Sequence, residues 1–225
     1  WSLKDLYSSE KEFDQEFKAI EKLTAAFEKW RSKLNNDLSD ADFLAAIRGL
    51  EEISRAAHRL GSYAGLWFSE DTQNQAALGL MAKTEQQSAE ISNRVLFFSL
   101  WWKDLPDVAA ERLMQNSGDY RYWLEEMRHF KPHTLTEPEE KIINTKNVTG
   151  INALNTLYET ITNRYMFKVE VEGEIKEMTR GELMSLVRSE DADLRARAYQ
   201  ELYRVYGQDG DILGIDEYRI EVTEL

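Results

Sequence analysis

The chain has 225 residues, of which 42% are hydrophobic and 31% are charged, the balance of a folded protein with a sizeable core rather than of a disordered segment. Its 41 acidic residues outnumber its 28 lysines and arginines, so the formal net charge is -13. A surface this negative repels phosphate backbones and anionic lipid head groups, so we expect neither a nucleic-acid partner nor a membrane partner.

The chain contains no cysteine, which excludes disulfides, thiolate metal sites and a cysteine nucleophile within it. Its longest strongly apolar run, Val95 to Trp102, is far shorter than the roughly 20 residues that span a bilayer. The first residues lack the basic stretch followed by an apolar one that marks a signal peptide. We therefore expect no transmembrane segment or signal peptide. The lack of cysteine fits a reducing cytosol, so a cytoplasmic location is expected.

Three long amphipathic helices are predicted in the first half of the chain. The first is expected over residues 9–36, where Ser9 and Glu12 form a capping box and apolar residues recur at helical spacing. The same spacing predicts a second helix over residues 39–66 and a third over residues 72–101.

Shorter helices are expected next, separated by Pro106 and Gly118. Thr136 and Glu139 then form a second capping box, ahead of a long helix that continues to Ile161.

The pattern changes between Phe167 and Met178, where the apolar period falls from about 3.6 to 2. Glu172 and Gly173 lie at the reversal, so a β-hairpin is predicted. Capped helices are expected after it, beginning at Thr179 and at Ser189 or Asp191.

The predicted fold class is mainly α: an antiparallel helical domain of long helices with one small β-hairpin. The sequence shows no internal repeat and no low-complexity linker, so residues 1–214 are expected to form one continuous helical domain. Residues 215–225 alternate apolar and polar side chains, which predicts a C-terminal strand in a separate tail.

The segment HFKPH places two histidines, His129 and His133, four residues apart. On a helix this spacing can present two imidazoles to one metal ion, but zinc also needs a third ligand. Pro132 lies between them and disfavours the helical conformation that the pairing requires. We therefore interpret the segment as a helix exit ahead of the Thr136 cap.

Other chemistry finds little support in the sequence. There is no G-x-S-x-G elbow, Walker loop or G-x-G-x-x-G turn, and His58 has no ligand partner at a useful spacing. Adjacent carboxylates are plentiful and are interpreted as solvated faces of an acidic chain. Aromatic residues form two groups: one of Phe97, Phe98, Trp101 and Trp102, and one of Tyr120, Tyr122 and Trp123. Either group could line a groove for apolar peptide side chains, although core packing is the more frequent explanation for such clusters.

Three segments carry a family resemblance: WSLKDLYSS over residues 1–9, HTLTEPEEKII over residues 133–143, and residues 167–203 from FKVEVEGEIK to YQELY. The first segment contains the pattern W-x-L-x-D-L-Y, and the second contains H-x-L-x-x-x-E-E ahead of a long predicted helix. The third contains the predicted hairpin, then T-x-x-E, then D-x-x-x-R-x-x-A-Y. This succession resembles the N-terminal region of the oligoendopeptidase F family of zinc metallopeptidases, over roughly Trp1 to Gly214.

The resemblance implies an intracellular enzyme that cuts short oligopeptides inside a deep channel, with zinc bound by H-E-x-x-H and a more distant glutamate in a helical catalytic region. No H-E-x-x-H occurs in this sequence, and none of its three histidines is followed by Glu. No catalytic, cofactor-binding or metal-binding residue is therefore assigned to this chain, and zinc is expected only in the parent enzyme.

What the resemblance implies for residues 1–214 is a non-catalytic N-terminal lobe that walls the substrate channel and is inactive alone. The expected partners are an oligopeptide substrate and the catalytic domain of the parent, together with some self-association through an exposed apolar face. The alternative is a free-standing helical interaction module whose aromatic surface docks a protein partner.

Overall fold

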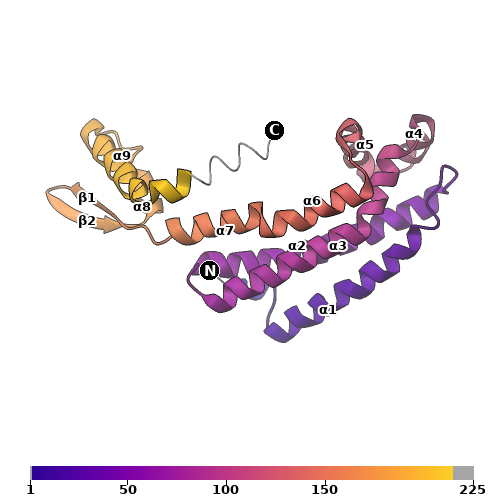
Figure 1. The fold of residues 1–225 in the computed structure, drawn as a ribbon, viewed down its shortest axis with the longest axis horizontal. Coiled ribbons are helices and arrows are strands. Elements are labelled where there is room, and N and C mark those ends of the chain that lie inside the picture. Colours follow the sequence, from indigo (N-terminus) through magenta and orange to yellow (C-terminus); the bar gives the residue numbers. More distant parts are fainter. Residues whose placement is uncertain (1, 215–225) are drawn as a thin grey trace. The chain divides into compact units, whose positions relative to one another are not determined.

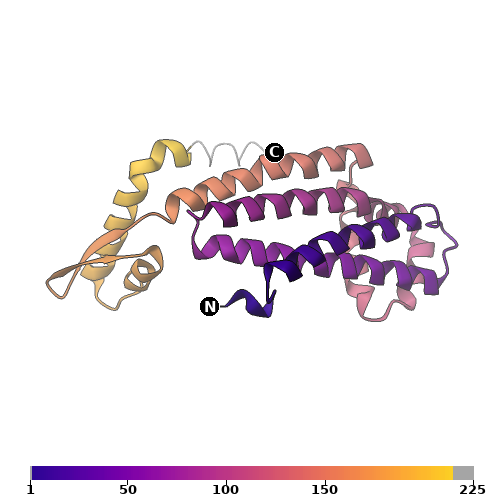
Figure 2. The same cartoon turned by 90° about the horizontal axis from the view of Figure 1, so that it is seen from below.

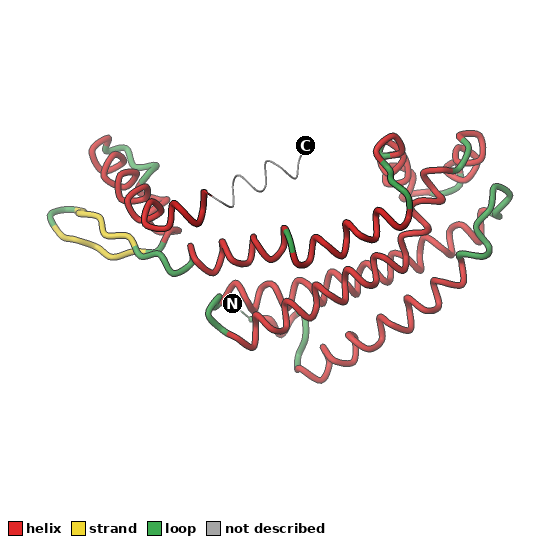
Figure 3. Tube along the Cα trace, viewed as in Figure 1, coloured by secondary structure: helices red, strands yellow, loops and turns green. Residues whose placement is uncertain are grey.

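The computed structural model describes residues 2–214, which divide into two compact units between Val148 and Thr149. Figures 1 and 3 show that helices dominate and that the strands of the described residues form one hairpin. The predicted mainly α class with a small β-hairpin is confirmed. The strand predicted over residues 215–225 lies outside the described residues. The single domain expected over residues 1–214 stays a prediction, because compact packing alone does not set domain limits.

The first unit is built on three helices that run side by side in alternating directions: α1 (Glu10–Phe27), α2 (Asp40–Glu70) and α3 (Gln75–Asp104) (Figures 1 and 2). Each begins after a side chain that accepts a backbone N–H of the first turn, from Ser9, Ser39 and Asn74 respectively. A short 3-10 turn, η1 (Leu3–Asp5), precedes them.

The first helix ends earlier than predicted. α1 stops at Phe27 and tightens into a 3-10 turn, η2 (Glu28–Trp30), as helix ends often do. Beyond it the Asn35 side chain accepts the backbone N–H of Asp37 at 2.8 Å, which offers the backbone a turn in place of another helical hydrogen bond.

Aromatic side chains dominate the core of the first unit. The indole ring of Trp102 is fully buried, with its centroid 5.1 Å from that of Phe43, and its Nε1 donates a 2.9 Å hydrogen bond to the carbonyl of Leu124. This bond satisfies the polar atom that burial would otherwise penalise.

Shorter elements complete the first unit. They are α4 (Asp107–Gln115), η3 (Gly118–Tyr120), α5 (Arg121–His129), η4 (Lys131–His133) and α6 (Glu137–Thr149). Gly118 has a φ of 58°, a conformation that glycine adopts at little cost.

The long helix predicted after Thr136 is in fact two helices. α6 ends at Thr149, and α7 (Ile151–Thr162) begins after Gly150. Gly150 has φ -104° and ψ -102°, which is not helical, so the ladder of backbone hydrogen bonds is interrupted there. Apolar spacing alone could not reveal this break, because Val148 and Ile151 on either side of the glycine are three positions apart, a helical spacing.

The second unit contains α7, a hairpin, α8 (Arg180–Leu186) and α9 (Ala192–Tyr206), followed by η5 (Gly207–Asp209). Strands β1 (Phe167–Val171) and β2 (Glu174–Met178) pair antiparallel, with Val171 opposite Glu174. Glu172 and Gly173, both with positive φ, form the predicted two-residue turn.

The core of the second unit lies between the hairpin and its two following helices. Its buried residues are Phe167, Val169, Met178, Leu183, Val187, Ala198 and Val205. The predicted capping box of α8 is complete, since Thr179 and Glu182 each accept the other's backbone N–H. Asp191 rather than Ser189 caps α9, because its side chain accepts the N–H groups of Asp193 and Leu194.

Candidate functional site

Helix α6 contacts the rest of the first unit through polar groups, and none of its residues is buried. Both carboxylate oxygens of Glu137 accept hydrogen bonds from the Arg31 guanidinium, at 3.0 and 2.7 Å. The Lys141 ammonium lies 2.6 Å from the same carboxylate. These hydrogen bonds from Arg31 and then Lys141 lower the pKa of Glu137 from 4.5 to about 2.

An amide cluster makes the second polar contact of α6. The Asn93 side chain of α3 donates to the hydroxyl of Thr145 at 3.2 Å and accepts from the Asn144 amide at 3.0 Å. Such bonds are directional and contribute only about 1 kcal/mol each, so they orient the helix without a large gain in stability.

Two isoleucines of α6 lie outside this polar contact. Ile142 is 61% exposed and Ile143 is 43% exposed. An amphipathic helix normally buries such residues against the core, so the polarity of α6 is inverted relative to its neighbours. This exposed apolar face of α6 is the candidate functional surface of the first unit.

The segment that precedes α6 contains the H-x-L-x-x-x-E-E pattern. Its two final glutamates act as caps: Glu139 accepts the backbone N–H of Thr136 at 2.9 Å, and Glu140 accepts that of Leu135 at 3.0 Å. Hydrogen bonds from Thr136 lower the pKa of Glu139. The Glu139 half of the predicted capping box is therefore present, while the Thr136 hydroxyl donates to the Glu139 carboxylate at 2.6 Å. Both acids act on backbone groups and not only on the helix dipole.

The two histidines of HFKPH do not share a helix face. His129 is the last residue of α5, and His133 is the last residue of η4, with Pro132 in its first turn. The interpretation of HFKPH as a helix exit is confirmed. Across residues 2–214 no group of three or more His, Cys, Asp or Glu side chains is arranged to bind a metal ion. The zinc that the family resemblance implies does not fit these residues, and we assign no chemistry to it here.

The two aromatic groups have different environments. Phe97, Phe98 and Trp102 are buried in the core, which agrees with the packing explanation for the first group. In the second group Tyr122 is exposed, and Trp123 on α5 is 40% exposed. Trp101, the remaining member of the first group, is half-buried and lines a pocket.

Sequence reasoning did not single out Arg31, Asn93 or Asn144. Each is one polar residue among many in the sequence, and its partner is distant: 106 positions separate Arg31 from Glu137, and 51 separate Asn93 from Asn144. No local spacing could have revealed these pairs, because helix patterns relate residues only three or four positions apart.

The helices in the part of the chain that the structure describes are too short or too polar to cross a membrane.

Comparison with known proteins gives consistent matches. The family model for the N-terminal region of M3 peptidases, described as Oligopeptidase F, matches residues 101–167, from the end of α3 to the start of β1. Oligopeptidase PepF of Bacillus subtilis is 23% identical over 218 residues, covering 92% of this chain and 32% of the relative. Group B oligopeptidase PepB of Streptococcus agalactiae is 25% identical over 216 residues, covering 92% of this chain and 35% of the relative. The chain thus spans about a third of the length of these relatives.

The fold is also found in a solved structure. The crystal structure of oligoendopeptidase-F from Enterococcus faecium superposes with a TM-score of 0.73 at 23% identity, covering 92% of this chain and 42% of that one. The family model, the relatives and the shared fold lead to one conclusion. Residues 101–167 are similar to the N-terminal region of oligopeptidase F-like peptidases, and the chain resembles such peptidases over 92% of its length.

Proposed function

We propose that this chain forms part of the wall of the substrate channel in an oligopeptide-cleaving zinc metalloendopeptidase of the cytoplasm. The zinc and the residues that activate water belong, in this proposal, to a catalytic region outside residues 1–225. That region and the oligopeptide are the partners of the chain, and nucleic acids and membranes are not.

The observation that carries the proposal is the exposed apolar face of α6. It lies within residues 101–167, the segment that matches the family model. Ile142 and Ile143 gain little from the core, and covering their exposed apolar area with another apolar group is favourable. Apolar side chains of a substrate supply such a cover, and the polar contacts of α6 keep the face turned outward.

The absence of cysteine from the chain allows a direct test of this face. A single cysteine is introduced by Ile142→Cys, and its rate of alkylation is measured with and without a short apolar peptide whose two ends are acetylated and amidated. We expect the peptide to slow alkylation at position 142. The matched control is Asp14→Cys, at an exposed position of α1, where no protection is expected. Equal rates with and without peptide at position 142 would contradict the channel role.

Zinc content and peptide cleavage measured on residues 1–225 test the second half of the proposal. We expect substoichiometric zinc and no turnover above the uncatalysed rate. Stoichiometric zinc with robust cleavage would show that the chemistry lies within this chain.

A further inference from the structure

A pocket of about 440 Å³ lies at the C-terminal end of α3. One side of the pocket is lined by Leu100, Trp101, Lys103 and Asp104 of α3. The other side lies between η4 and the start of α6 and includes Lys131, Leu135 and Glu137. Its volume falls within the roughly 300–1,000 Å³ of small-molecule sites. The pocket is separate from the exposed apolar face of α6, which is formed by Ile142 and Ile143.

The charges around the pocket are of two kinds. The Glu137 carboxylate is already neutralised by Arg31 and Lys141. The side chains of Lys103, Lys131 and Asp104 make no ion pair or hydrogen bond within the described residues. The charges left for a ligand are therefore two ammonium groups and one carboxylate.

The rest of the lining is apolar. The Trp101 indole and the side chains of Leu100 and Leu135 offer a surface for a branched or aromatic side chain. A ligand complementary to this lining carries a carboxylate, a nearby N–H donor and an apolar side chain. These three groups occur together in one small unit, an N-acylated apolar amino acid with a free carboxylate.

We propose that the pocket binds this unit, either as the C-terminal residue of a short peptide or as a free N-acyl amino acid. The carboxylate lies between Lys103 and Lys131, the amide N–H donates to Asp104, and the side chain packs on Trp101. The proposal uses none of the residues of the exposed apolar face of α6, so it can fail or succeed independently of the proposed channel.

The first test titrates the chain with N-acetyl-leucine and follows the two-dimensional NMR signal of the Trp101 indole N–H, assigned with Trp101→Phe. We expect a saturable shift, and binding of N-acetyl-leucinamide about tenfold weaker because it lacks the carboxylate. Equal binding of acid and amide would overturn the proposal. The end-blocked peptide used to probe the α6 face also lacks the carboxylate, so the two proposals have separate probes.

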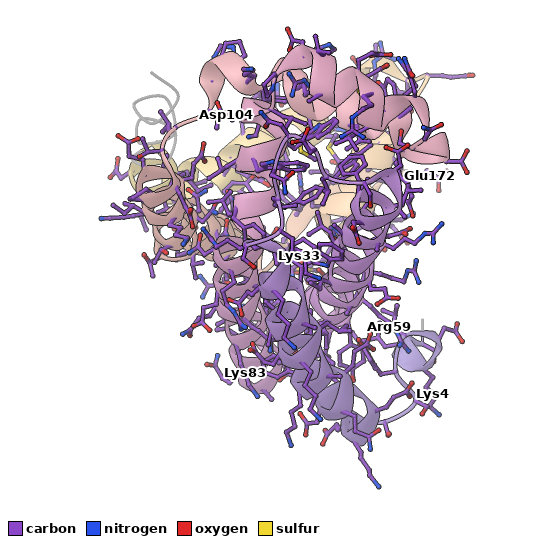
Figure 4. All side chains as sticks on the ribbon, turned by 90° about the vertical axis from the view of Figure 1, so that its right-hand side faces the viewer. Lys4, Lys33, Arg59, Lys83, Asp104 and Glu172 are labelled. Atoms are coloured by element: carbon purple, nitrogen blue, oxygen red, sulfur yellow. The ribbon has the colours of Figure 1, made fainter. Side chains whose placement is uncertain are left out.

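The second test removes the two ammonium groups with Lys103→Gln and Lys131→Gln together. N-acetyl-leucine is expected to bind about tenfold more weakly to this double variant. The control double variant is Lys18→Gln with Lys83→Gln, which makes the same change in net charge around a different groove. Figure 4 labels Lys83 and Asp104 at well-separated places along α3. Equal weakening in both double variants would show general electrostatic attraction and overturn the site.

The third test addresses Asp104 and the source of the ligand. Isocaproic acid keeps the side chain and the carboxylate but lacks the amide, so we expect it to bind more weakly than N-acetyl-leucine. That difference is expected to disappear in Asp104→Ala, and its persistence would contradict the assigned role of Asp104. Tighter binding of an acetylated tripeptide ending in leucine supports a peptide C-terminus as the occupant, and equal binding supports the free N-acyl amino acid.

Discussion

Helices α3 and α6 lie in the same unit, yet they use opposite faces to pack. α3 buries Phe98 and Trp102 in the aromatic core and leaves polar residues outside. α6 turns Glu137 and Asn144 toward its neighbours and leaves Ile142 and Ile143 outside. One unit thus contains a helix that packs through its apolar face and a helix that packs through its polar face. Apolar burial stabilises the first strongly, whereas the few polar bonds of the second mainly set its orientation.

The largest expected effect comes from the core side of this comparison. Trp102→Ala is expected to lower the free energy of unfolding by about 3–5 kcal/mol, because it opens a cavity and leaves the carbonyl of Leu124 without its donor. Urea unfolding followed by circular dichroism measures the change. The control is Trp123→Ala at a 40% exposed position of α5, with an expected loss under about 1 kcal/mol. Similar losses in the two variants would show that the core does not carry the stability.

A smaller effect is expected when the ion pair of α6 is broken. Arg31→Met keeps most of the side-chain packing but removes the hydrogen-bond donors to Glu137. We expect it to lower the free energy of unfolding by about 1 kcal/mol. Hydrogen exchange should become faster in α6 and stay unchanged in α3. The control is Arg55→Met, whose exposed pair with Glu51 at 3.4 Å is worth no more than about 0.5 kcal/mol. Unchanged exchange in α6 would mean that other contacts hold the helix.

The pH dependence of this ion pair is a third prediction. The folded state lowers the pKa of Glu137 from 4.5 to about 2. The contribution of its ionised carboxylate to the free energy of unfolding is therefore fully present above about pH 4.5, and it is lost as the pH falls through about 2. The stability difference between the wild-type chain and Glu137→Gln should therefore shrink across this window. Denaturant titrations at several pH values measure it, and a difference that stays constant down to about pH 2 would contradict the assigned pKa.

The smallest effect on stability is expected on the exposed face. Ile142→Ser together with Ile143→Ser should change the free energy of unfolding by no more than about 0.5 kcal/mol per site, since neither side chain is buried. Light scattering at rising concentration should show less self-association, because the apolar patch is gone. Val108→Ser, at an 86% exposed position of α4, serves as the control for an isolated apolar residue. A wild-type chain that stays monomeric at high concentration would count against the predicted self-association.

Much of the local structure could be predicted from the sequence, because caps and turns depend on neighbours. Ser9, Ser39 and Thr179 begin helices as expected, and Glu172 with Gly173 forms the turn of the hairpin. Gly150 was missed, because one glycine can be tolerated within a helix or end it, and packing decides between the two.

The candidate surfaces could be predicted only in part. The H-x-L-x-x-x-E-E pattern marked the right segment, and its role as a cap followed from helix chemistry. Its place beside α3, and the pocket that Leu135 and Lys131 share with Trp101, could not be read from the pattern. The residues concerned lie more than twenty positions apart, beyond the reach of helical periodicity.

The sequence by itself determined the helical class, the hairpin and the end of the helix at HFKPH, since propensity, capping and apolar period are properties of short segments. Only the tertiary structure decided which face of α6 points outward. In isolation its isoleucines would predict a face turned toward the core, but Arg31 and Asn93, contributed by distant segments, bind the polar face instead. Long-range pairing of charges and amides thus overrode the local hydrophobic pattern in α6, because those pairs fix its polar face against the unit.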